Sequence, residues 1–259
     1  MRARRTAVSR RGGDDPGYLR VMNHLQRFGP LAAAFLLLVL VVQGLGFGPR
    51  PDAIEKGLAP VFGRTIELFD GRSLDGWRSF SRDDAGEGSG AWSVKDGILV
   101  CNGRPIGYLQ TEMEFENFEL TLEWRFDPKK GAGNSGVLLR TVGEDTVWPN
   151  SIEAQLHSRD AGDIWNIGDF PMRADATRTR GRRTVKGHET NEKALGEWNR
   201  YRIRLDRGAL TLEVNGLIQN EASECREVPG RIALQSEGAH IEFRNIDLRP
   251  IVAWRRAER

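Results

Sequence analysis

The feature that most constrains the fold of this chain is a two-residue alternation of apolar and polar side chains. The stretch FELTLEWRF at 118–126 alternates apolar residues with Glu, Thr and Arg, so one face of an extended strand is apolar. The stretches RYRIRLD at 200–206 and ALTLEVNG at 209–216 have the same period, and few segments between about 64 and 252 show a helical one. The pattern predicts an all-β domain, in which two antiparallel sheets pack as a jelly-roll sandwich.

The turns between these strands can also be predicted. The residues DRG at 206–208 join two alternating stretches closely enough for a hairpin, and Asn215-Gly216 is a dipeptide typical of a tight turn. In HIEFRNIDL at 240–248 the apolar phase changes, which predicts a β-bulge near Asn245. We expect one core between the sheets, to which these stretches contribute Leu120, Leu122, Ile203, Leu205, Leu212 and Val214.

The N-terminal part differs from the rest in composition. Residues 1–30 form a basic tail, with seven arginines and two aspartates before residue 28. Residues 31–48, LAAAFLLLVLVVQGLGFG, carry no charge and predict one hydrophobic helix, either a secretory signal peptide or a transmembrane anchor. Because the basic side stays in the cytoplasm, we expect the remainder in the periplasm or at the cell surface. A linker at 49–63 then precedes a domain at 64–252 and a short tail at 253–259.

Charge and cysteine content give weaker constraints. The formal net charge is +2, from 38 basic and 36 acidic residues, and such a balance predicts no nucleic-acid partner. Cys101 and Cys225 lie in the part expected to be exported, where a disulfide is permitted. Cys101 in the apolar GILVC is equally consistent with a small buried side chain. Neither cysteine has the spacing of a metal ligand.

A row of polar residues stands on one predicted strand. In SIEAQLHS at 151–158 the apolar residues face one way, and the other face carries Glu153, Gln155 and His157. The earlier GVLLR at 136–140 is apolar on both faces, which predicts a covered strand with Arg140 at the floor of a groove. Since a buried arginine needs a carboxylate, we expect Glu153 to pair with Arg140. The row is then either a catalytic site or a structural polar layer.

Several segments occur in an order that resembles one known family. They include IELFDGRSLDGW (66–77), WSVKDGILVCNG (92–103), GNSGVLLR (133–140), IEAQLHS (152–158), GEWNRYRIRL (196–205) and GRIALQSEGAHIEFRNIDLRPI (230–251). Their order and spacing resemble the 3-keto-disaccharide hydrolase domain family over nearly all of 64–252. The resemblance implies a jelly roll of the concanavalin A-like lectin and glucanase type, usually exported and linked to the breakdown of 3-oxo sugars. Some members have Asp-His-Gly where this chain has SEG at 236–238, so Glu237 stands in place of that histidine.

On this resemblance we expect an exported enzyme, a hydrolase or a lyase, that cleaves a 3-oxo glycoside by acid–base elimination in the groove. A 3-oxo group acidifies the hydrogen on C2, so the reaction needs a base, an acid for the leaving oxygen and a group that stabilises the enolate. We expect Glu153 and His157 as base and acid, and Arg140 or a divalent cation as the stabiliser. The alternative is a non-catalytic carbohydrate-binding jelly-roll domain. The expected substrate-binding residues are Asn134, Gln155, Trp165, Gln235, Glu237 and His188.

Two segments next to the row would complete such a site. The loop at 159–172 contains Trp165, whose ring face would stack on a sugar. The basic segment at 172–193 is more typical of a solvated excursion than of a rim that attracts an anionic glycan, and His188 near its end would return towards the groove. A metal site of Glu153, His157 and His188 is conceivable, although no fixed spacing requires one. We expect four other tryptophans to lie in the core, namely Trp77, Trp92, Trp124 and Trp198.

The location of the domain is testable with a reporter. Alkaline phosphatase fused after residue 60 should be active, because the uncharged run at 31–48 behind an arginine-rich tail should carry the reporter across the membrane. An inactive fusion, together with activity of a reporter that works only in the cytoplasm, would contradict the expected export.

Overall fold

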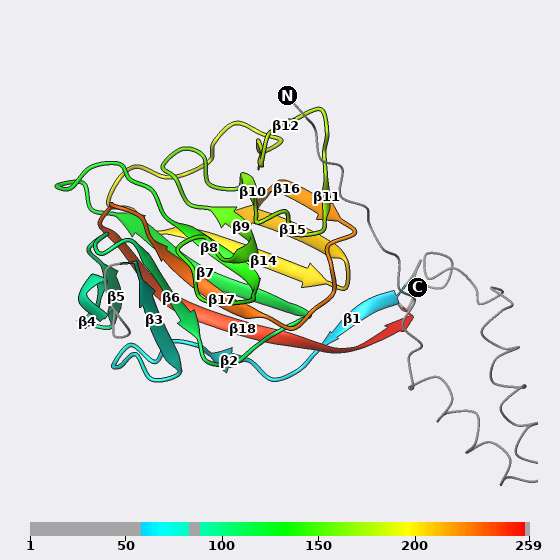
Figure 1. Cartoon of the computed structure of the whole chain (residues 1–259), viewed down its shortest axis with the longest axis horizontal. Helices are drawn as coiled ribbons and strands as arrows, with labels where there is room; N and C mark the ends of the chain where they lie inside the picture. The colour runs from blue at the N-terminus through cyan, green and yellow to red at the C-terminus, as the bar shows by residue number, and fades with distance from the viewer. Residues whose placement is uncertain (1–57, 83–88, 257–259) are drawn as a thin grey trace, which may run out of the picture. The chain divides into compact units, whose positions relative to one another are not determined.

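The alternating stretches form strands, and the described residues of the computed structural model, 58–82 and 89–256, pair them into two antiparallel sheets (Figure 1). We call the larger one the back sheet. Its order is β11-β16-β15-β14-β7-β18-β5-β4, and β1 and β2 also pair with β18. Its strands are β1 (Leu58–Phe62), β2 (Ile66–Glu67), β4 (Trp92–Lys95), β5 (Ile98–Cys101), β7 (Phe118–Phe126), β11 (Arg173–Ala174), β14 (Asn199–Asp206), β15 (Ala209–Val214), β16 (Leu217–Ser223) and β18 (Ile241–Arg256).

The other sheet, which we call the site sheet, has the order β12-β13-β10-β9-β8-β17-β6-β3. Its strands are β3 (Trp77–Ser81), β6 (Gly107–Thr111), β8 (Gly136–Val142), β9 (Asn150–Gln155), β10 (Ile164–Ile167), β12 (Thr179–Arg180), β13 (Arg183–Thr184) and β17 (Arg231–Ser236). A short 3₁₀ turn, η2 (Ser89–Ala91), precedes β4. Among the described residues no helix is long and apolar enough to span a membrane. The hydrophobic helix expected at 31–48 lies outside the described residues.

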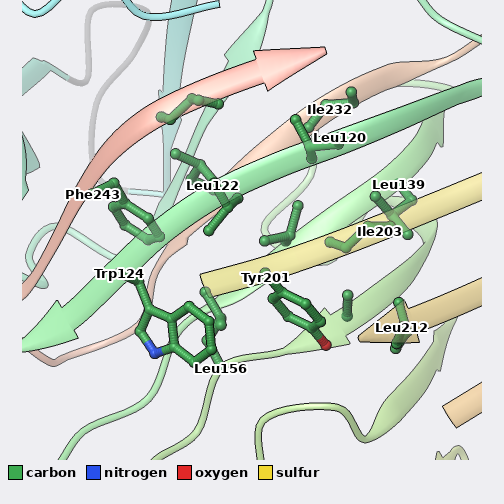
Figure 2. Packing of buried hydrophobic residues seen from close by; sticks show 14 of the residues in the cluster. Leu120, Leu122, Trp124, Leu139, Leu156, Tyr201, Ile203, Leu212, Ile232 and Phe243 are labelled. Atoms are coloured by element: carbon green, nitrogen blue, oxygen red, sulfur yellow. The ribbon is translucent and has the colours of Figure 1, made fainter. Parts of the chain in front are cut away.

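One hydrophobic core fills the space between the two sheets (Figure 2). The six side chains expected there are at most 1% exposed, which confirms the assignment of faces. The site sheet contributes Leu139, Leu156 and Ile232 from the opposite side. Full burial of an aliphatic side chain stabilises the folded state by about 1.5–3 kcal/mol, because its apolar surface is removed from water. The core therefore dominates the stability of the fold.

The tryptophans follow the prediction with one exception. Trp77, Trp92 and Trp124 are buried in the core. Trp198 is only partly buried, and the guanidinium groups of Arg125 and Arg244 lie 4.5 and 4.1 Å from its ring centroid. The prediction was wrong for Trp198 because this residue precedes the first residue of β14, where the alternation that assigns a face has not yet begun.

The predicted turns and bulge are confirmed. β14 and β15 form a hairpin in which Asp206 pairs with Ala209. Asn215 and Gly216 both have positive φ, 47° and 87°, which is the conformation that favours Asn-Gly in two-residue hairpin turns. In β18 the register against β7 shifts between Arg244 and Asp247, and Asn245 has φ of 50°.

The sheet extends past both expected limits of the domain. β1 pairs with the last part of β18, with Leu58 opposite Arg256 and Phe62 opposite Ile251 (Figure 1). Residues 58–62 of the expected linker and 253–256 of the expected tail are therefore strands of the back sheet. Cys101 and Cys225 are both buried and free, and both pack in the core.

Arg140 is fully buried, but it does not reach the outer face of the site sheet as predicted. The register of β8 shifts between Leu139 and Val142 relative to β9, and Arg140 has φ of 49°. This bulge inserts one residue and reverses the side on which Arg140 would lie. Its guanidinium donates five hydrogen bonds of 2.6–3.3 Å to the backbone carbonyls of Glu116, Arg207, Cys225 and Arg226. Arg140 therefore ties three loops together, and the expected ion pair with Glu153 is wrong.

We expect Arg140→Met to lower the free energy of unfolding by about 2–4 kcal/mol, because buried carbonyls lose a charged donor. Arg204→Met is the matched control, since Arg204 is a partly exposed arginine on β14. It should change the stability by less than about 0.5 kcal/mol. Urea unfolding of both variants measures the difference. A loss under about 1 kcal/mol for Arg140→Met would contradict the structural role.

Candidate active site

The polar row of β9 lies on the outer face of the site sheet. Ile152, Ala154 and Leu156 are completely buried in the core, so the alternation turns Glu153 and Gln155 to the opposite face. Glu153 lies beside Trp165 on the neighbouring β10. Trp165 was expected in a loop, but it belongs to a strand, which gives its ring a fixed position next to the carboxyl group.

Glu153 lies in a pocket of about 230 Å³, which we call the inner pocket. Although it lines this pocket, the residue is only 5% exposed. Two tryptophans and an arginine contribute to the walls, together with one polar side chain of the same strand and two from other segments. The lining residues are Asn134, Trp148, Glu153, Gln155, Trp165, Ile167, Arg182 and Glu237.

Two carboxyl groups influence one another in this pocket. Burial, and then the charge of Glu237, raise the pKa of Glu153 to about 8, while Gln235 and the charge of Arg182 act in the opposite direction. Burial also raises the pKa of Glu237, against the charge of His157 and a hydrogen bond from Asn134 Nδ2 to Glu237 Oε2 of 2.6 Å. Both carboxyl groups therefore hold a proton more firmly than an exposed glutamate does.

A second pocket of about 510 Å³, the outer pocket, adjoins the first. Asn134 and Glu237 line both pockets, so they form the wall between them. His157 lines only the outer pocket, and its Nδ1 lies 3.0 Å from Asp160 Oδ2. The structure thus brings His157 to the same cleft as Glu153, but on the far side of Glu237. Lys130 and His240 also line the outer pocket.

Several buried polar atoms around the inner pocket have no hydrogen-bond partner among the described residues. They are Asn134 Oδ1, Glu153 Oε1, Trp165 Nε1 and both side-chain polar atoms of Gln235. Buried polar atoms are normally paired, so a cluster of free donors and acceptors is typical of a site that binds a polar ligand. Gly136 makes room for this cluster, because a Cβ there would lie 2.4 Å from both Glu153 Oε1 and Gln235 Oε1.

Gln155 has a more local role than predicted. It lines the inner pocket, but its Oε1 accepts hydrogen bonds of 2.8 Å from the backbone amides of Leu156 and His157. Its side chain therefore stabilises the end of β9, and only its Nε2 amide group is left to bind a ligand.

Two predicted site residues are not brought to the cleft. Arg140 lies in the bulge described above. His188 is exposed and lines neither pocket, because the segment that carries it passes over β16, where the neighbouring Gly187 N donates to Gln219 O. The suggested metal set of Glu153, His157 and His188 is therefore not assembled. In the described part of the chain no group of three His, Cys, Asp or Glu side chains is placed to hold a metal ion.

Sequence reasoning missed Arg182 and Trp148. Arg182 was counted with a basic segment expected to be solvated, and its closeness to Glu153 depends on the pairing of distant strands. Trp148 is 44% exposed and lines the inner pocket. Its signal was an aromatic residue in a polar loop between two strands of the site sheet, a context in which binding residues concentrate.

The fold and the cleft define a class of protein, a two-sheet β-sandwich with a carboxylate-bearing polar cleft on the outer face of one sheet. Comparison with family models identifies the particular family. Residues 64–249 match the model of the 3-keto-alpha-glucoside-1,2-lyase-like domain, so the chain belongs to this family.

One relative and two solved structures are similar to this chain. A curated Bacteroides thetaiotaomicron protein named 3-keto-disaccharide hydrolase is 29% identical over 164 residues, which are 56% of this chain and 53% of the relative, so the match spans about half of its length. A structure from Parabacteroides distasonis, provisionally designated a glycosyl hydrolase, has a TM-score of 0.54 at 19% identity and covers 78% of this chain and 97% of its own. Bacillus licheniformis β-glucanase has a TM-score of 0.50 at 11% identity, with 73% and 98% covered. These structures show that the sandwich has the predicted jelly-roll type.

The raised pKa of Glu153 predicts a pH-dependent effect on stability. Below pH 4.5, the ordinary pKa of a glutamate, the carboxyl is protonated in both the folded and the unfolded chain. Between pH 4.5 and about 8 it ionises in the unfolded chain but not in the folded one, so this residue destabilises the fold increasingly as the pH rises. Glu153→Gln should therefore be more stable than the wild type at pH 8, by about 2–4 kcal/mol more than at pH 5.

Thermal unfolding at the two pH values measures this difference. Glu189→Gln removes an exposed carboxylate outside both pockets and controls for the loss of one negative charge. An equal effect of Glu153→Gln at pH 5 and pH 8 would show that the carboxyl is not held in the environment described.

Proposed function

We propose that this chain is an exported enzyme that cleaves 3-oxo glycosides by acid–base elimination in the cleft of the site sheet. The observation that carries the proposal is the pair of Glu153, which is buried, and Glu237, which is partly buried. Both carboxyl groups have a raised pKa, and they share a pocket lined by unpartnered polar atoms. The family match and the name of the Bacteroides thetaiotaomicron relative support the substrate class. The uncharged run at 31–48 supports export.

Glu153 is the proposed base. A carboxylate with a pKa of about 8 takes up a proton far more readily than an ordinary glutamate, and it lies close to the pH at which most enzymes work. The 3-oxo group acidifies the hydrogen on C2 of the sugar, so a base of this strength in a pocket sheltered from water suits its removal. Trp165 next to Glu153 offers a ring face for the apolar side of the sugar.

Glu237 is the proposed acid. It lies in the wall between the two pockets, where the glycosidic bond of a ligand that occupied both would be. Because the two carboxyl groups influence one another, the pair would act with one shared proton, which lies on Glu237 when Glu153 is the ionised base, and Asn134 Nδ2 fixes one oxygen of Glu237. The oxidised sugar would bind in the inner pocket and the leaving group in the outer one, beside His157 and Lys130.

A second enzymatic reaction is favoured by the same two carboxyl groups. Ordinary glycoside hydrolysis uses a pair of Asp or Glu residues on either side of the scissile bond and needs no 3-oxo group. A non-catalytic carbohydrate-binding domain is the third candidate, since unpartnered polar atoms and aromatic side chains also suit plain binding. The three candidates differ in the substrates that they turn over.

The test compares a 3-oxo disaccharide with its unoxidised parent, using the purified chain. We expect cleavage of the 3-oxo compound alone, together with exchange of its C2 hydrogen in deuterated water. The rate should rise with pH up to about 8, because the base must be ionised. Glu153→Gln should lower kcat about 10²–10⁴-fold and abolish the exchange, while the protein stays folded. Glu189→Gln should behave as the wild type.

Each alternative gives a different result. Cleavage of the unoxidised parent at a similar rate would favour two-carboxylate hydrolysis. Binding of either sugar without cleavage or exchange would favour a carbohydrate-binding domain, and in both cases the elimination mechanism would be wrong.

A further inference from the structure

The basic segment at 172–193 is exposed over much of its length, as expected, but it is folded. Arg173–Ala174 joins the back sheet as β11, and Thr179–Arg180 and Arg183–Thr184 form a small hairpin, β12 and β13, at the edge of the site sheet next to β10 (Figure 1). The side chains of Thr179 and Thr184 share a hydrogen bond of 2.9 Å across this hairpin. The basic residues of the segment therefore have defined positions.

Six arginine and lysine residues lie between 173 and 186, and five of them have partners in the protein. Arg173 and Arg178 pair with Glu224 at 3.0 Å and Asp175 at 2.9 Å. Arg180 donates to the backbone carbonyls of Thr177 and Thr179. The partner of Arg183 is Asp163, at 2.5 Å, and Lys186 donates to the carbonyl of Arg159. These contacts hold the segment in place, and the three carboxylates neutralise part of its charge.

Arg182 is different. In the described part of the chain it has no ion pair and no side-chain hydrogen bond, and its guanidinium carbon lies 5.9 Å from the ring centroid of Trp165. Its side chain lines the inner pocket together with Glu153. A cation without a carboxylate partner thus faces the group proposed as the base.

The backbone holds Arg182 in a fixed place. Gly181 and Arg182 form the two-residue loop between Arg180 and Arg183, which are opposite one another in the hairpin. Gly181 has φ of 58°, as the first central residue of a type II′ turn requires. The carbonyl of Arg182 accepts a hydrogen bond of 2.9 Å from Asn166 N on β10. The turn is therefore attached to the strand that carries Trp165.

We propose that Arg182 is the catalytic residue that stabilises the enolate oxygen during cleavage of a 3-oxo glycoside, the role for which the sequence suggested Arg140 or a divalent cation. This inference rests on the proposed function. When Glu153 takes the proton from C2, the C–H electron pair forms the C2–C3 double bond, and the carbonyl pair moves onto the oxygen at C3. The guanidinium of Arg182 donates hydrogen bonds to that oxygen. The electron pair on that oxygen then re-forms the C3 carbonyl, and the pair of the C2–C3 double bond moves to form C1=C2. The C1–O bond breaks at the same time, and Glu237 protonates the leaving oxygen.

The position of Arg182 fits this role better than that of the other basic side chains near the cleft. Lys130, His157 and His240 line the outer pocket, away from the sugar that carries the 3-oxo group. Arg182 is itself exposed on its turn, but its side chain lines the same pocket as Glu153, which is 5% exposed, so a charge formed at the bottom of this pocket is screened less than one at the open surface. A guanidinium that is not already neutralised by a carboxylate of the protein retains its charge for the transition state.

The experiment measures kcat, KM and exchange of the C2 hydrogen with a 3-oxo disaccharide for Arg182→Gln and Arg182→Lys. The matched control is Arg180→Gln, which removes an exposed arginine of the same turn that lines neither pocket. We expect Arg182→Gln to lower kcat and the exchange rate about 10²–10³-fold with little change in KM, because the enolate charge exists only after proton transfer. Arg182→Lys should keep a larger part of the rate, and Arg180→Gln should match the wild type.

A pH profile separates catalysis from a structural role. The charge of Arg182 lowers the pKa of Glu153, so its loss in Arg182→Gln should move the rising limb of the pH–rate profile to higher pH. Arg180→Gln should not show this shift, and the two variants should melt at similar temperatures. Wild-type rates in Arg182→Gln, or a raised KM with unchanged kcat, would overturn the role of Arg182 and leave the proposed function intact. A wild-type protein that neither exchanges nor cleaves the 3-oxo disaccharide would overturn both.

Discussion

The cleft depends on one constraint, that β9 keeps a carboxyl group on one face while its other face is locked in the core. Ile152, Ala154 and Leu156 are completely buried between the sheets. A slip of one residue would exchange the two faces and place Glu153 among aliphatic side chains, so the register is strongly specified. The core therefore stabilises the fold and also fixes the orientation of Glu153. Since burial of this carboxyl disfavours its ionised form, part of the stability that the core supplies offsets the cost of the site.

The two arginines show how a local irregularity changes a role. Arg140 would share a face with Leu138 in a regular strand, but the bulge turns it away from the cleft, where it binds backbone carbonyls of three loops. Arg182 reaches the inner pocket from a turn that the sequence did not associate with β9. A cation near the carboxylates was thus a reasonable expectation from the chemistry. Which arginine supplies this cation depends on the register of β8 and on the pairing of strands that are distant in the sequence.

The sequence predicted the parts of the structure that depend on local pattern. Alternation gave the core residues of β7, β14 and β15, and Asn215-Gly216 and the phase change at Asn245 gave a turn and a bulge. It also placed Glu153 on an outer face. Alternation alone could not place Glu237 next to Glu153, because a separation of 84 positions carries no periodic signal, and only the family resemblance put both residues in one groove. The bulge at Arg140 was missed because the positive φ of a non-glycine residue has no reliable signature in a single sequence.

The polar row of β9 was open to two interpretations from the sequence, a site or a structural polar layer. A structural layer would be expected to satisfy its own hydrogen bonds, as Arg140 does with four carbonyl groups. Around Glu153 the opposite holds, since both polar atoms of Gln235, Glu153 Oε1 and Trp165 Nε1 lack partners among the described residues. Gly136 keeps open the space into which two of these side chains point, and a single methyl group would occupy it. An arrangement that leaves donors and acceptors unpaired is costly for a fold but useful for a ligand that carries hydroxyl and carbonyl groups, so the geometry favours a site.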